Sequence, residues 1–305
     1  MNIMNLINAL PGAVAQGLIW GIMAIGVYIT FRILDIADLT VDGTLCTGGA
    51  VCIMMMQSGQ NVWISMVIAL IAGMLAGMAT GLLHTFMGIP AILAGILTQL
   101  GLYSINLKIM GKANQAINVD KYDLLVSLRY IKGVPFYKNT ILIVALMIVV
   151  LIFILYWFFG TELGCSLRAT GCNDKMARAQ GINTDFNRVL GLMLSNGLVA
   201  LSGALLSQYQ GFADINMGRG AIVIGLAAVI IGEAIFGKIF RNFGFQLLAV
   251  AFGSIIYYFV LQIVIWMGID TDLLKLLSAV VVAIFLAIPT WKSRYFSKPV
   301  RKGGV

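Results

Sequence analysis

Residues 160 to 188, GTELGCSLRATGCNDKMARAQGINTDFNR, form a long polar segment that separates two apolar runs. The segment carries both charge signs, several glycines and residues that commonly begin helices. Thr161 is placed to cap a first short helix that ends at Gly171, and Asn173 is placed to cap a second that ends at Gly181. The pattern predicts a two-helix insert between two membrane spans.

The second of these helices carries charges that suit its dipole, because Asp174 lies in its first turn and Arg178 in its last. Met176, Ala177 and Ala179 would leave a small, partly apolar surface that another protein could grip. The insert is therefore a candidate docking element for a soluble partner. An ordinary loop at the membrane surface is the alternative that the segment by itself leaves open.

The composition places the chain in a membrane. It is 60% hydrophobic and 10% charged, with a mean hydropathy of +0.97, whereas a soluble domain carries about 25% charged residues. Seven apolar stretches, most of them reaching the roughly 20 residues that cross a bilayer core, are 12 to 31, 62 to 83, 89 to 107, 140 to 160, 189 to 210, 243 to 269 and 276 to 291. Two shorter stretches, 39 to 56 with Asp42 and 220 to 236 with Glu233, raise the prediction to about nine helices. We predict an all-α, polytopic membrane protein in which residues 1–305 form a single transmembrane domain.

The orientation follows from where the basic residues fall. With the C-terminus in the cytoplasm, 12 of the 20 Lys and Arg residues lie inside, including those of the basic tail 292–305. Six of the other eight lie in one outer loop, 108–138, which runs against the positive-inside rule. We keep this orientation because the tail and the segment 161–188 then share the cytoplasmic side. Basic flanks that face anionic lipid explain the net charge of +8 without a nucleic acid partner.

Groups that catalysis or metal binding would need are sparse. Cys46, Cys52, Cys165 and Cys172 lack metal-site spacing with a histidine, and His84, the only histidine, is expected at the inner interface of its helix. The acids lie near span ends and in loops. We therefore expect a chain that is not an enzyme and that binds no cofactor or metal itself. The N-terminus has no basic region before its first charge, so we expect the first helix to stay in the mature protein.

Three glycines recur at four-residue spacing along the third predicted helix. Gly73, Gly77 and Gly81 would lie on one face, where the absence of side chains lets another helix backbone approach closely. We assign these glycines a packing role.

An internal sequence repeat suggests a path through the membrane. The turn at 37 to 43, ADLTVDG, resembles the turn at 213 to 220, ADINMGRG, and each opens a short span rich in small residues. In the orientation above, the first turn lies on the cytoplasmic side and the second on the outer side, so the two copies run in opposite directions. Inverted repeats place a transport path at their interface. The candidate path residues are Asp38, Asp42, Asp214, Asn216 and Arg219.

The charged members of this set have two possible roles. Asp38 and Asp214 could cap the two short helices or line the path, and both roles stay open. Asp42 and Arg219 are favoured as path-lining residues, because a charge at a helix centre costs about 2.5 to 3.5 kcal/mol and should face water or protein rather than lipid.

A run of residues in the polar segment matches a known family. The matching residues are Leu163, Gly164, Leu167, Arg168, Ala169, Gly171, Ala177, Gly181, Ile182 and Asn183. The run resembles the cytoplasmic coupling segment in membrane subunits of the branched-chain amino acid ABC importers, whose superfamily includes ribose-type sugar permeases. Residues 202 to 206 followed by Gly211 are similar to the family's next helix and outer turn, and residues 26 to 49 are similar in layout to its first two helices. The resemblance spans most of the chain and is weaker outside the coupling segment.

The resemblance implies the permease subunit of an ATP-driven importer. Two copies of a cytoplasmic ABC ATPase would bind ATP and Mg²⁺, and their closure would swing the transmembrane halves between outward-facing and inward-facing states. An extracellular or periplasmic binding protein would deliver the solute. A second permease copy, as a homodimer or a related pair, would complete the path in a prokaryotic cell membrane. The residues expected to couple to the ATPase are Gly164, Leu167, Arg168, Ala169, Gly171, Asn173, Asp174, Met176, Ala177, Arg178 and Gly181.

A departure from the family's pattern bears on the solute. The run at 38 to 43, DLTVDG, stands where the branched-chain permeases carry an Asn-Phe-Ala-His-Gly type sequence. It is similar to a subgroup that pairs with lipoproteins thought to bind aromatic amino acids such as tryptophan or tyrosine. We therefore expect import of an amino acid, aromatic before branched-chain. Sugars and nucleosides stay as alternatives.

Two functions of other classes compete with this interpretation. A secondary transporter driven by an ion gradient would share the inverted repeats, but mid-span acids or histidines that could carry coupling ions are scarce. An export or scaffold subunit would share the docking element without importing a solute.

Overall fold

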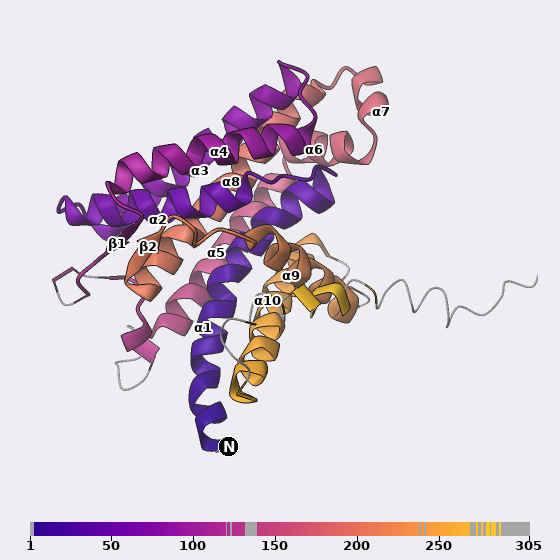
Figure 1. The fold of residues 1–305 in the computed structure, drawn as a ribbon. Coiled ribbons are helices and arrows are strands. Elements are labelled where there is room, and N and C mark those ends of the chain that lie inside the picture. The colour runs from indigo at the N-terminus through magenta and orange to yellow at the C-terminus, as the bar shows by residue number, and fades with distance from the viewer. Residues whose placement is uncertain are drawn as a thin grey trace, which may run out of the picture.

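The computed structural model describes residues 3–119, 121, 122, 124–131, 139–237, 239, 240 and 242–268, with isolated positions between 273 and 287. Within this part of the chain the structure is a helical bundle with one small sheet (Figure 1). The helices are α1 (Ile3–Tyr28), α2 (Val41–Gln57), α3 (Val62–Thr85), α4 (Ala91–Met110), α5 (Thr140–Phe159), α6 (Glu162–Cys172), α7 (Asp174–Ala179), α8 (Thr184–Gln210), α9 (Ala221–Phe236) and α10 (Phe243–Trp266). The strands are β1 (Asn114–Ala116) and β2 (Phe212–Asp214). A π-helical turn, Ile29–Ile33, extends α1, and a 3-10 turn covers Leu128–Ile131.

The predicted fold class, an all-α polytopic membrane protein, is confirmed. Six helices are long and apolar enough to cross a membrane, namely α1 with its π-helical turn, α3, α4, α5, α8 and α10. The two short predicted spans are also helical, as α2 with 17 residues and α9 with 16. The predicted count of nine is not confirmed, because the last predicted helix, 276–291, lies largely outside the described residues. The tail 292–305 lies outside them entirely.

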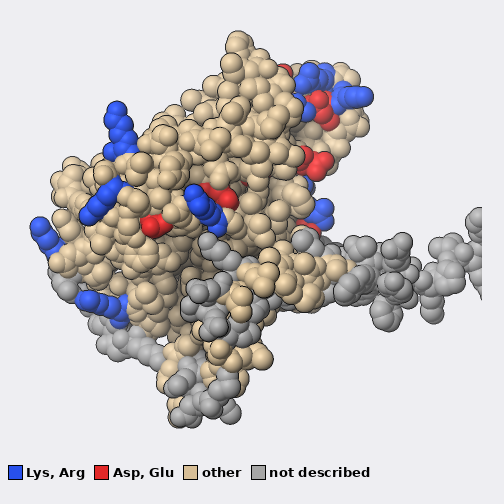
Figure 2. Space-filling model, viewed as in Figure 1, with Lys and Arg blue, Asp and Glu red and all other residues tan. Residues whose placement is uncertain are grey.

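The bundle has enclosed and peripheral helices. Most of the residues of α1 and α8 are buried, whereas most of the residues of α4 and α5 are not. Large apolar side chains such as Leu100, Phe153 and Trp157 are exposed on these outer helices, as expected for a surface that faces lipid. Figure 2 shows charged side chains of both signs over α6 and α7, and further Lys and Arg side chains at the opposite side, by β1. The surface between these two ends is mostly uncharged.

The three spaced glycines of α3 form its contact with α8. A Cβ atom built at Gly77 would collide with the carbonyl group of Leu192, and one at Gly73 with the carbonyl group of Asn196. At Gly81 the nearest atom would be the Cα of Val189. The close backbone approach predicted from the four-residue spacing is therefore confirmed.

The two short helices are reached by non-helical segments that enter the bundle from opposite ends. Residues 34 to 40 lead from the π-helical turn to the start of α2, and residues 211 to 220 lead from the end of α8 to the start of α9. The two starts touch, because a Cβ atom at Gly218 would collide with the carbonyl group of Asp42. The sequence placed the two polar turns at opposite membrane surfaces. They meet instead, since each non-helical segment carries its helix start inward.

The far ends of α2 and α9 lie at opposite ends of the bundle, so the predicted opposed directions hold. Gln57, the last residue of α2, donates from Nε2 to the carbonyl oxygen of Ala116 in β1 at 2.8 Å. Strands β1 and β2 pair antiparallel, with Asn114 opposite Asp214, and cover this end. α9 runs the other way, toward the π-helical turn and the α6–α7 end, where its Glu233 meets Arg32.

A valine at Gly77 tests the contact between α3 and α8. We expect Gly77→Val to lower the thermal unfolding temperature and the yield of folded protein in detergent, because the side chain would push the two backbones apart. Overpacking of this kind costs about 1 to 3 kcal/mol, or more where backbone has to move. Gly101→Val on α4 is the matched control, since a Cβ there would meet nothing within 4 Å. Equal unfolding temperatures for the two variants would contradict the assignment.

Candidate translocation path and coupling surface

The start of α2 is held by a buried carboxylate. Asp38 is 2% exposed, and its Oδ1 accepts from the backbone N–H of Thr40 at 2.9 Å while its Oδ2 accepts from Nδ2 of Asn196 at 2.6 Å. Asn196 also accepts, at its Oδ1, from the hydroxyl of Thr44 at 2.8 Å. The bond to Thr40 closes the turn that leads into α2, whose N-cap residue is Thr40, so Asp38 stabilises this turn and is not itself the N-cap of the helix.

A row of threonines continues this network across three helices. The hydroxyl oxygens of Thr40 and Thr80 are 2.7 Å apart, and Thr80 donates to the hydroxyl of Thr98 at 2.9 Å. The sequence patterns did not single out Asn196, Thr80 or Thr98. Their signal was present, because polar residues inside apolar spans are expensive and commonly mark a structural or functional network.

The carboxylate of Asp42 crosses from α2 to the first turn of α9. Its Oδ2 accepts from the N–H of Gly220 at 2.9 Å, and its Oδ1 accepts from the N–H of Ile222 at 3.0 Å. Gly220 precedes α9 with φ +85° and has no side chain that could cap the helix itself. Asp42 therefore serves as the N-cap of a helix 178 residues further along the chain. Its negative charge also suits the positive end of the α9 dipole.

The second polar turn uses its aspartate in the same manner as the first. Oδ1 of Asp214 accepts from the N–H of Asn216 at 2.7 Å, and Oδ2 accepts from Nδ2 of Asn114 at 3.3 Å. Asp214 thus stabilises the turn and joins it to β1. The side chain of Asn216 is exposed. Asp38 and Asp214 each accept from the backbone N–H two residues ahead in their own turns, and neither is the N-cap residue of the short helix that follows.

Arg219 differs from the other predicted path residues because it is exposed and takes part in no ion pair within the described residues. It lines a hollow of about 110 Å³. Other residues that line the hollow include Asp42, Gln99, Tyr103 and Asn106. The structure thus brings Asp42 and Arg219 to one hollow at the meeting point of the two short helices.

An ion pair joins the other end of α9 to the end of α1. Arg32 donates from Nε and a terminal nitrogen to the two carboxylate oxygens of Glu233, at 2.7 and 2.9 Å. The sequence patterns did not predict this pair. The signal was available, because Arg32 is the only basic residue before Lys108 and Glu233 is the only acid in its span.

The predicted helix starts in the polar segment are confirmed. The hydroxyl of Thr161 accepts from the N–H of Gly164 at 3.3 Å at the start of α6. Oδ1 of Asn173 accepts from the N–H of Met176 at 3.1 Å at the start of α7. Each cap provides an acceptor for one of the N–H groups that a helix start leaves unpaired.

Ion pairs stiffen the turn between α7 and α8. Arg178 contacts Asp174 at 3.5 Å and Asp185 at 2.9 Å, and Arg188 contacts Asp174 at 3.2 Å. The predicted positions of Asp174 and Arg178 in the first and last turns of α7 are confirmed. Because four charged groups share these contacts, the network holds α7 against the start of α8 more firmly than one exposed pair would.

The predicted coupling residues divide into an inner and an outer set. Gly164, Leu167 and Ala177 are buried, so they attach the segment to the body of the chain. The prediction that Ala177 belongs to the exposed surface for a partner protein is therefore wrong, because α7 turns this side chain toward the body of the chain. Arg168, Ala169, Asn173, Met176, Arg178 and Gly181 are exposed, and Asp174 is half-buried.

The two glycines predicted to end the short helices play different parts. Gly181 has φ +81°, the left-handed conformation expected of a helix-ending glycine. Gly171 does not end α6, which continues to Cys172, and this part of the prediction is wrong. A Cβ atom at Gly171 would collide with the carbonyl group of Ile33 and lie 2.9 Å from the Cα of Leu34. Gly171 therefore places the polar segment directly against the π-helical turn.

His84 has a structural role in the turn between α3 and α4. Its Nδ1 lies 2.8 Å from the carbonyl oxygen of Ile89, so the ring ties the turn between α3 and α4. This placement at the end of α3 agrees with the predicted position at the end of a span.

Comparison with known proteins identifies relatives over nearly the whole chain. A family model described as "Branched-chain amino acid transport system / permease component" matches residues 10–288. A tyrosine transport system permease protein of Clostridioides difficile (strain R20291) is 37% identical over 280 residues, 92% of this chain and 91% of the relative. An uncharacterized protein of Rickettsia prowazekii (strain Madrid E) is 38% identical over 284 residues, 92% of this chain and 97% of the relative.

More distant similarities extend to other permeases. A fructose import permease protein of Bifidobacterium longum (strain NCC 2705) is 25% identical over 269 residues, 87% of this chain and 73% of the relative. The solved structure of PsaBC from Streptococcus pneumoniae in complex with Fab aligns with a TM-score of 0.55 at 17% identity, covering 97% of this chain and 99% of the other. At this identity the structural likeness shows a shared fold only.

Removal of the Asp42 carboxylate tests the cap across the two helices. We expect Asp42→Ala to lower thermal stability by about 0.5 to 2 kcal/mol, the cost of losing an N-cap, and to impair solute uptake while the protein still inserts into the membrane. Asp42→Asn should keep most of the stability, because its amide oxygen can still accept from one N–H. Unfolding in detergent and uptake in proteoliposomes are the measurements. Wild-type stability and uptake in Asp42→Ala would exclude this role.

Proposed function

Because this chain belongs to the family of permease components of branched-chain amino acid transport systems, we propose that its solute is an aromatic amino acid, with tyrosine as the first candidate. The chain is a membrane permease subunit of an ABC importer. The observation that carries the choice of solute is the 37% identity, over 92% of this chain, to a tyrosine transport system permease. The DLTVDG run of the first polar turn, which differs from the branched-chain pattern, supports the same class.

The exposed face of the polar segment 161–188 supports its proposed role as the docking element for a cytoplasmic ATPase. Leu163, Met176 and Phe186 are 51%, 61% and 53% exposed, although they lie on a surface that is otherwise polar. The caps and ion pairs keep this surface in one shape, so little ordering would be needed when a partner binds. Two copies of the ATPase would carry ATP and Mg²⁺, and the permease itself would do no catalysis.

A continuous series of contacts would carry motion from the docking element to the path. α6 touches the π-helical turn at Gly171, and this turn leads through residues 34 to 40 into α2. The first turn of α2 then holds the start of α9 through Asp42. The ion pair between Arg32 and Glu233 links the other end of α9 to the same π-helical turn. A shift of the segment would therefore change the spacing of the two short helices.

The remaining partners follow from the same proposal. The α6–α7 end and the C-terminal tail would lie in the cytoplasm of a prokaryotic cell, and the sheet and the loop 108–138 would lie outside. There an external binding protein would deliver the solute. A second permease copy, as a homodimer, would complete the path, because a two-fold axis matches a pair of ATPases. Within one copy, Asp42, Asn216 and Arg219 would border the path, and Asp38 and Asp214 would hold its walls.

Uptake by the complete complex tests the solute. We expect the permease, purified with its associated ATPase and binding protein and placed in proteoliposomes, to take up radiolabelled tyrosine when ATP is present on the ATPase side. Tryptophan should compete, while leucine and fructose should compete weakly. Vanadate should stop uptake. Faster uptake of leucine or fructose than of tyrosine would overturn the proposed solute, and vanadate-resistant uptake would overturn the ATP-driven mechanism.

A charge on the exposed apolar face tests the docking role. We expect Met176→Glu to abolish co-purification of the ATPase while membrane expression stays normal, because the new carboxylate would have to be desolvated at the interface. Met87→Glu is the matched control, since Met87 is 65% exposed in the turn between α3 and α4 and lies outside the segment. ATPase retention by Met176→Glu, or equal loss from both variants, would argue against docking at this surface.

A further inference from the structure

We propose that an anionic phospholipid binds where the end of α5 meets the start of α10, with an acyl chain in an apolar groove and its phosphate beside Arg168. Two hollows lie next to each other at this place, one of about 310 Å³ and one of about 350 Å³. Tyr156 and Asn242 line both of them, so the two hollows adjoin. The proposal concerns a lipid that stays bound, and it holds whichever solute the permease carries.

The first hollow is a groove with apolar walls. Val149, Ile152 and Phe153 of α5 line one side, and Phe245 and Leu248 of α10 line the other. Val149, Phe153 and Phe245 are 57%, 71% and 50% exposed, so the groove opens outward, toward the lipid. An acyl chain in the groove would cover these side chains.

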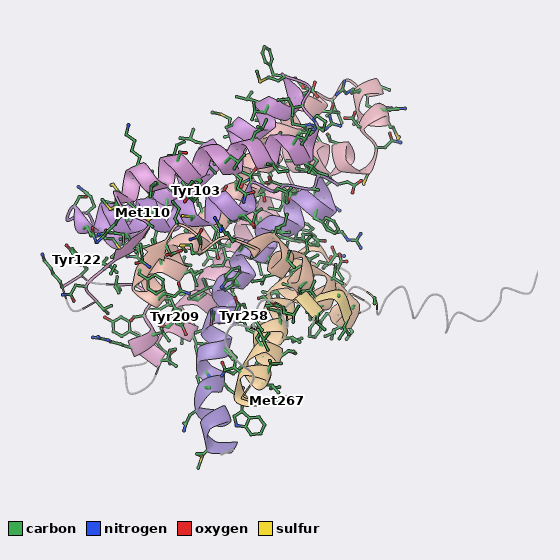
Figure 3. The ribbon with its side chains drawn as sticks, in the orientation of Figure 1. Tyr103, Met110, Tyr122, Tyr209, Tyr258 and Met267 are labelled. Atoms are coloured by element: carbon green, nitrogen blue, oxygen red, sulfur yellow. The ribbon has the colours of Figure 1, made fainter. Side chains whose placement is uncertain are left out.

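The groove has a floor of packed protein. At the end of α5, the ring of Phe159 lies 4.9 Å from the ring of Phe243 on α10, measured between centroids. Further along α10, Tyr258, labelled in Figure 3, packs against Trp20 of α1 with ring centroids 6.0 Å apart. Phe159 and Tyr258 are buried. The groove is therefore a cleft on the outer surface of two packed helices, and an acyl chain would enter it from the membrane.

The end of α5 carries aromatic residues that are typical of a membrane interface. Tyr156 and Trp157 lie in its last turn and are both exposed. Tyrosine and tryptophan are enriched where the hydrocarbon core meets the lipid head groups. α6, which carries Arg168, begins directly after this turn, at Glu162. The groove therefore lies at the level of the acyl chains, and Arg168 lies at the level of the head groups.

The second hollow has one charged side chain among the described residues that line it. These residues are Tyr156, Phe159, Gly160, Arg168, Asn242 and Phe243. The guanidinium carbon of Arg168 lies 5.5 Å from the centre of the Phe243 ring, and Arg168 takes part in no ion pair within the described part of the chain. A guanidinium stacked on a ring keeps the N–H donors at its edge available. These donors match the oxygens of a phosphate.

The charges around the second hollow favour an anion. Glu162, in the first turn of α6, is not among the residues that line it, and the charge of Glu233 on α9 is balanced by Arg32 at 2.7 Å. The start of α10 adds positive potential, because Asn242 gives its first turn no side-chain acceptor. A phosphodiester carries one negative charge, which balances the single charge of Arg168. In a zwitterionic lipid the head group's own cation competes for the phosphate, so an anionic lipid fits better.

Native mass spectrometry of the full-length permease with its associated subunits, stripped of lipid in detergent, tests the site. The probes are dioleoyl phosphatidylglycerol, phosphatidylcholine with the same chains, dioleoylglycerol, which lacks the phosphate, and glycerol 1-phosphate, which lacks the chains. We expect one saturable site that binds phosphatidylglycerol at least about tenfold more tightly than dioleoylglycerol or glycerol 1-phosphate, with phosphatidylcholine between, since a hydrogen bond to a charged group is worth that factor. Arg168→Gln should weaken phosphatidylglycerol binding about tenfold and leave dioleoylglycerol binding unchanged.

A second pair of variants tests the groove outside the polar segment, because Arg168 is also one of the residues expected to couple to the ATPase. Val149→Trp should fill the groove and weaken the binding of phosphatidylglycerol and dioleoylglycerol alike. Val150→Trp is the matched control, since Val150 is 49% exposed on the same helix and does not line the groove. It should bind both lipids as wild type does.

A charge control separates the site from general attraction of anionic lipid to a basic surface. Lys175→Gln removes one charge from the exposed surface of α7 and should bind phosphatidylglycerol as wild type does. An unchanged unfolding temperature would show that each variant is folded. Equal binding of phosphatidylglycerol and dioleoylglycerol, equal losses from Arg168→Gln and Lys175→Gln, or equal effects of the two tryptophans would overturn the lipid site. The proposed solute would stand in each of these cases, because its test is uptake by the complete complex.

Discussion

The carboxylate of Asp42 holds together the two short helices, α2 and α9, where their starts meet. Inside a membrane every backbone N–H needs a partner within the protein, and α9 begins at a glycine that cannot cap it. α2 supplies that partner from across the bundle, through hydrogen bonds of 2.9 and 3.0 Å to the first turn of α9. The position of α9 is thereby tied to that of α2, and α2 is tied in turn to α8 through Asp38 and Asn196. The non-helical segment before α9 can therefore enter the bundle while the N–H groups of Gly220 and Ile222 keep acceptors.

This arrangement also has mechanical consequences for the proposed coupling. The contacts between the polar segment and the π-helical turn, and between α3 and α8, are made by glycines against backbone. Such contacts have no side chain that could change rotamer and absorb a shift, so the elements move together or separate. The pair of Arg32 with Glu233 closes the connection at the far end of α9. Displacement of the docking element would thus reach the meeting point of α2 and α9 through rigid neighbours.

The chemistry of the meeting point follows from the same capping. Asp42 and Arg219 line the same hollow with opposite charges, because the backbone N–H groups that Asp42 binds leave its negative charge in place.

Local chemistry decided what the sequence could predict. Apolar runs identify the membrane spans, the caps at Thr161 and Asn173 bond to N–H groups three residues away, and the glycine spacing of α3 is set by the helix repeat. Only the tertiary structure shows that Asp42 caps a helix 178 residues later, that Asp38 meets Asn196 across 158 residues, and that Gly171 packs on Ile33 instead of ending α6. The physical reason is that a carboxylate or a glycine has the same sequence signature whether it serves its own helix or a distant one. Which of these partners it meets depends on how the helices pack.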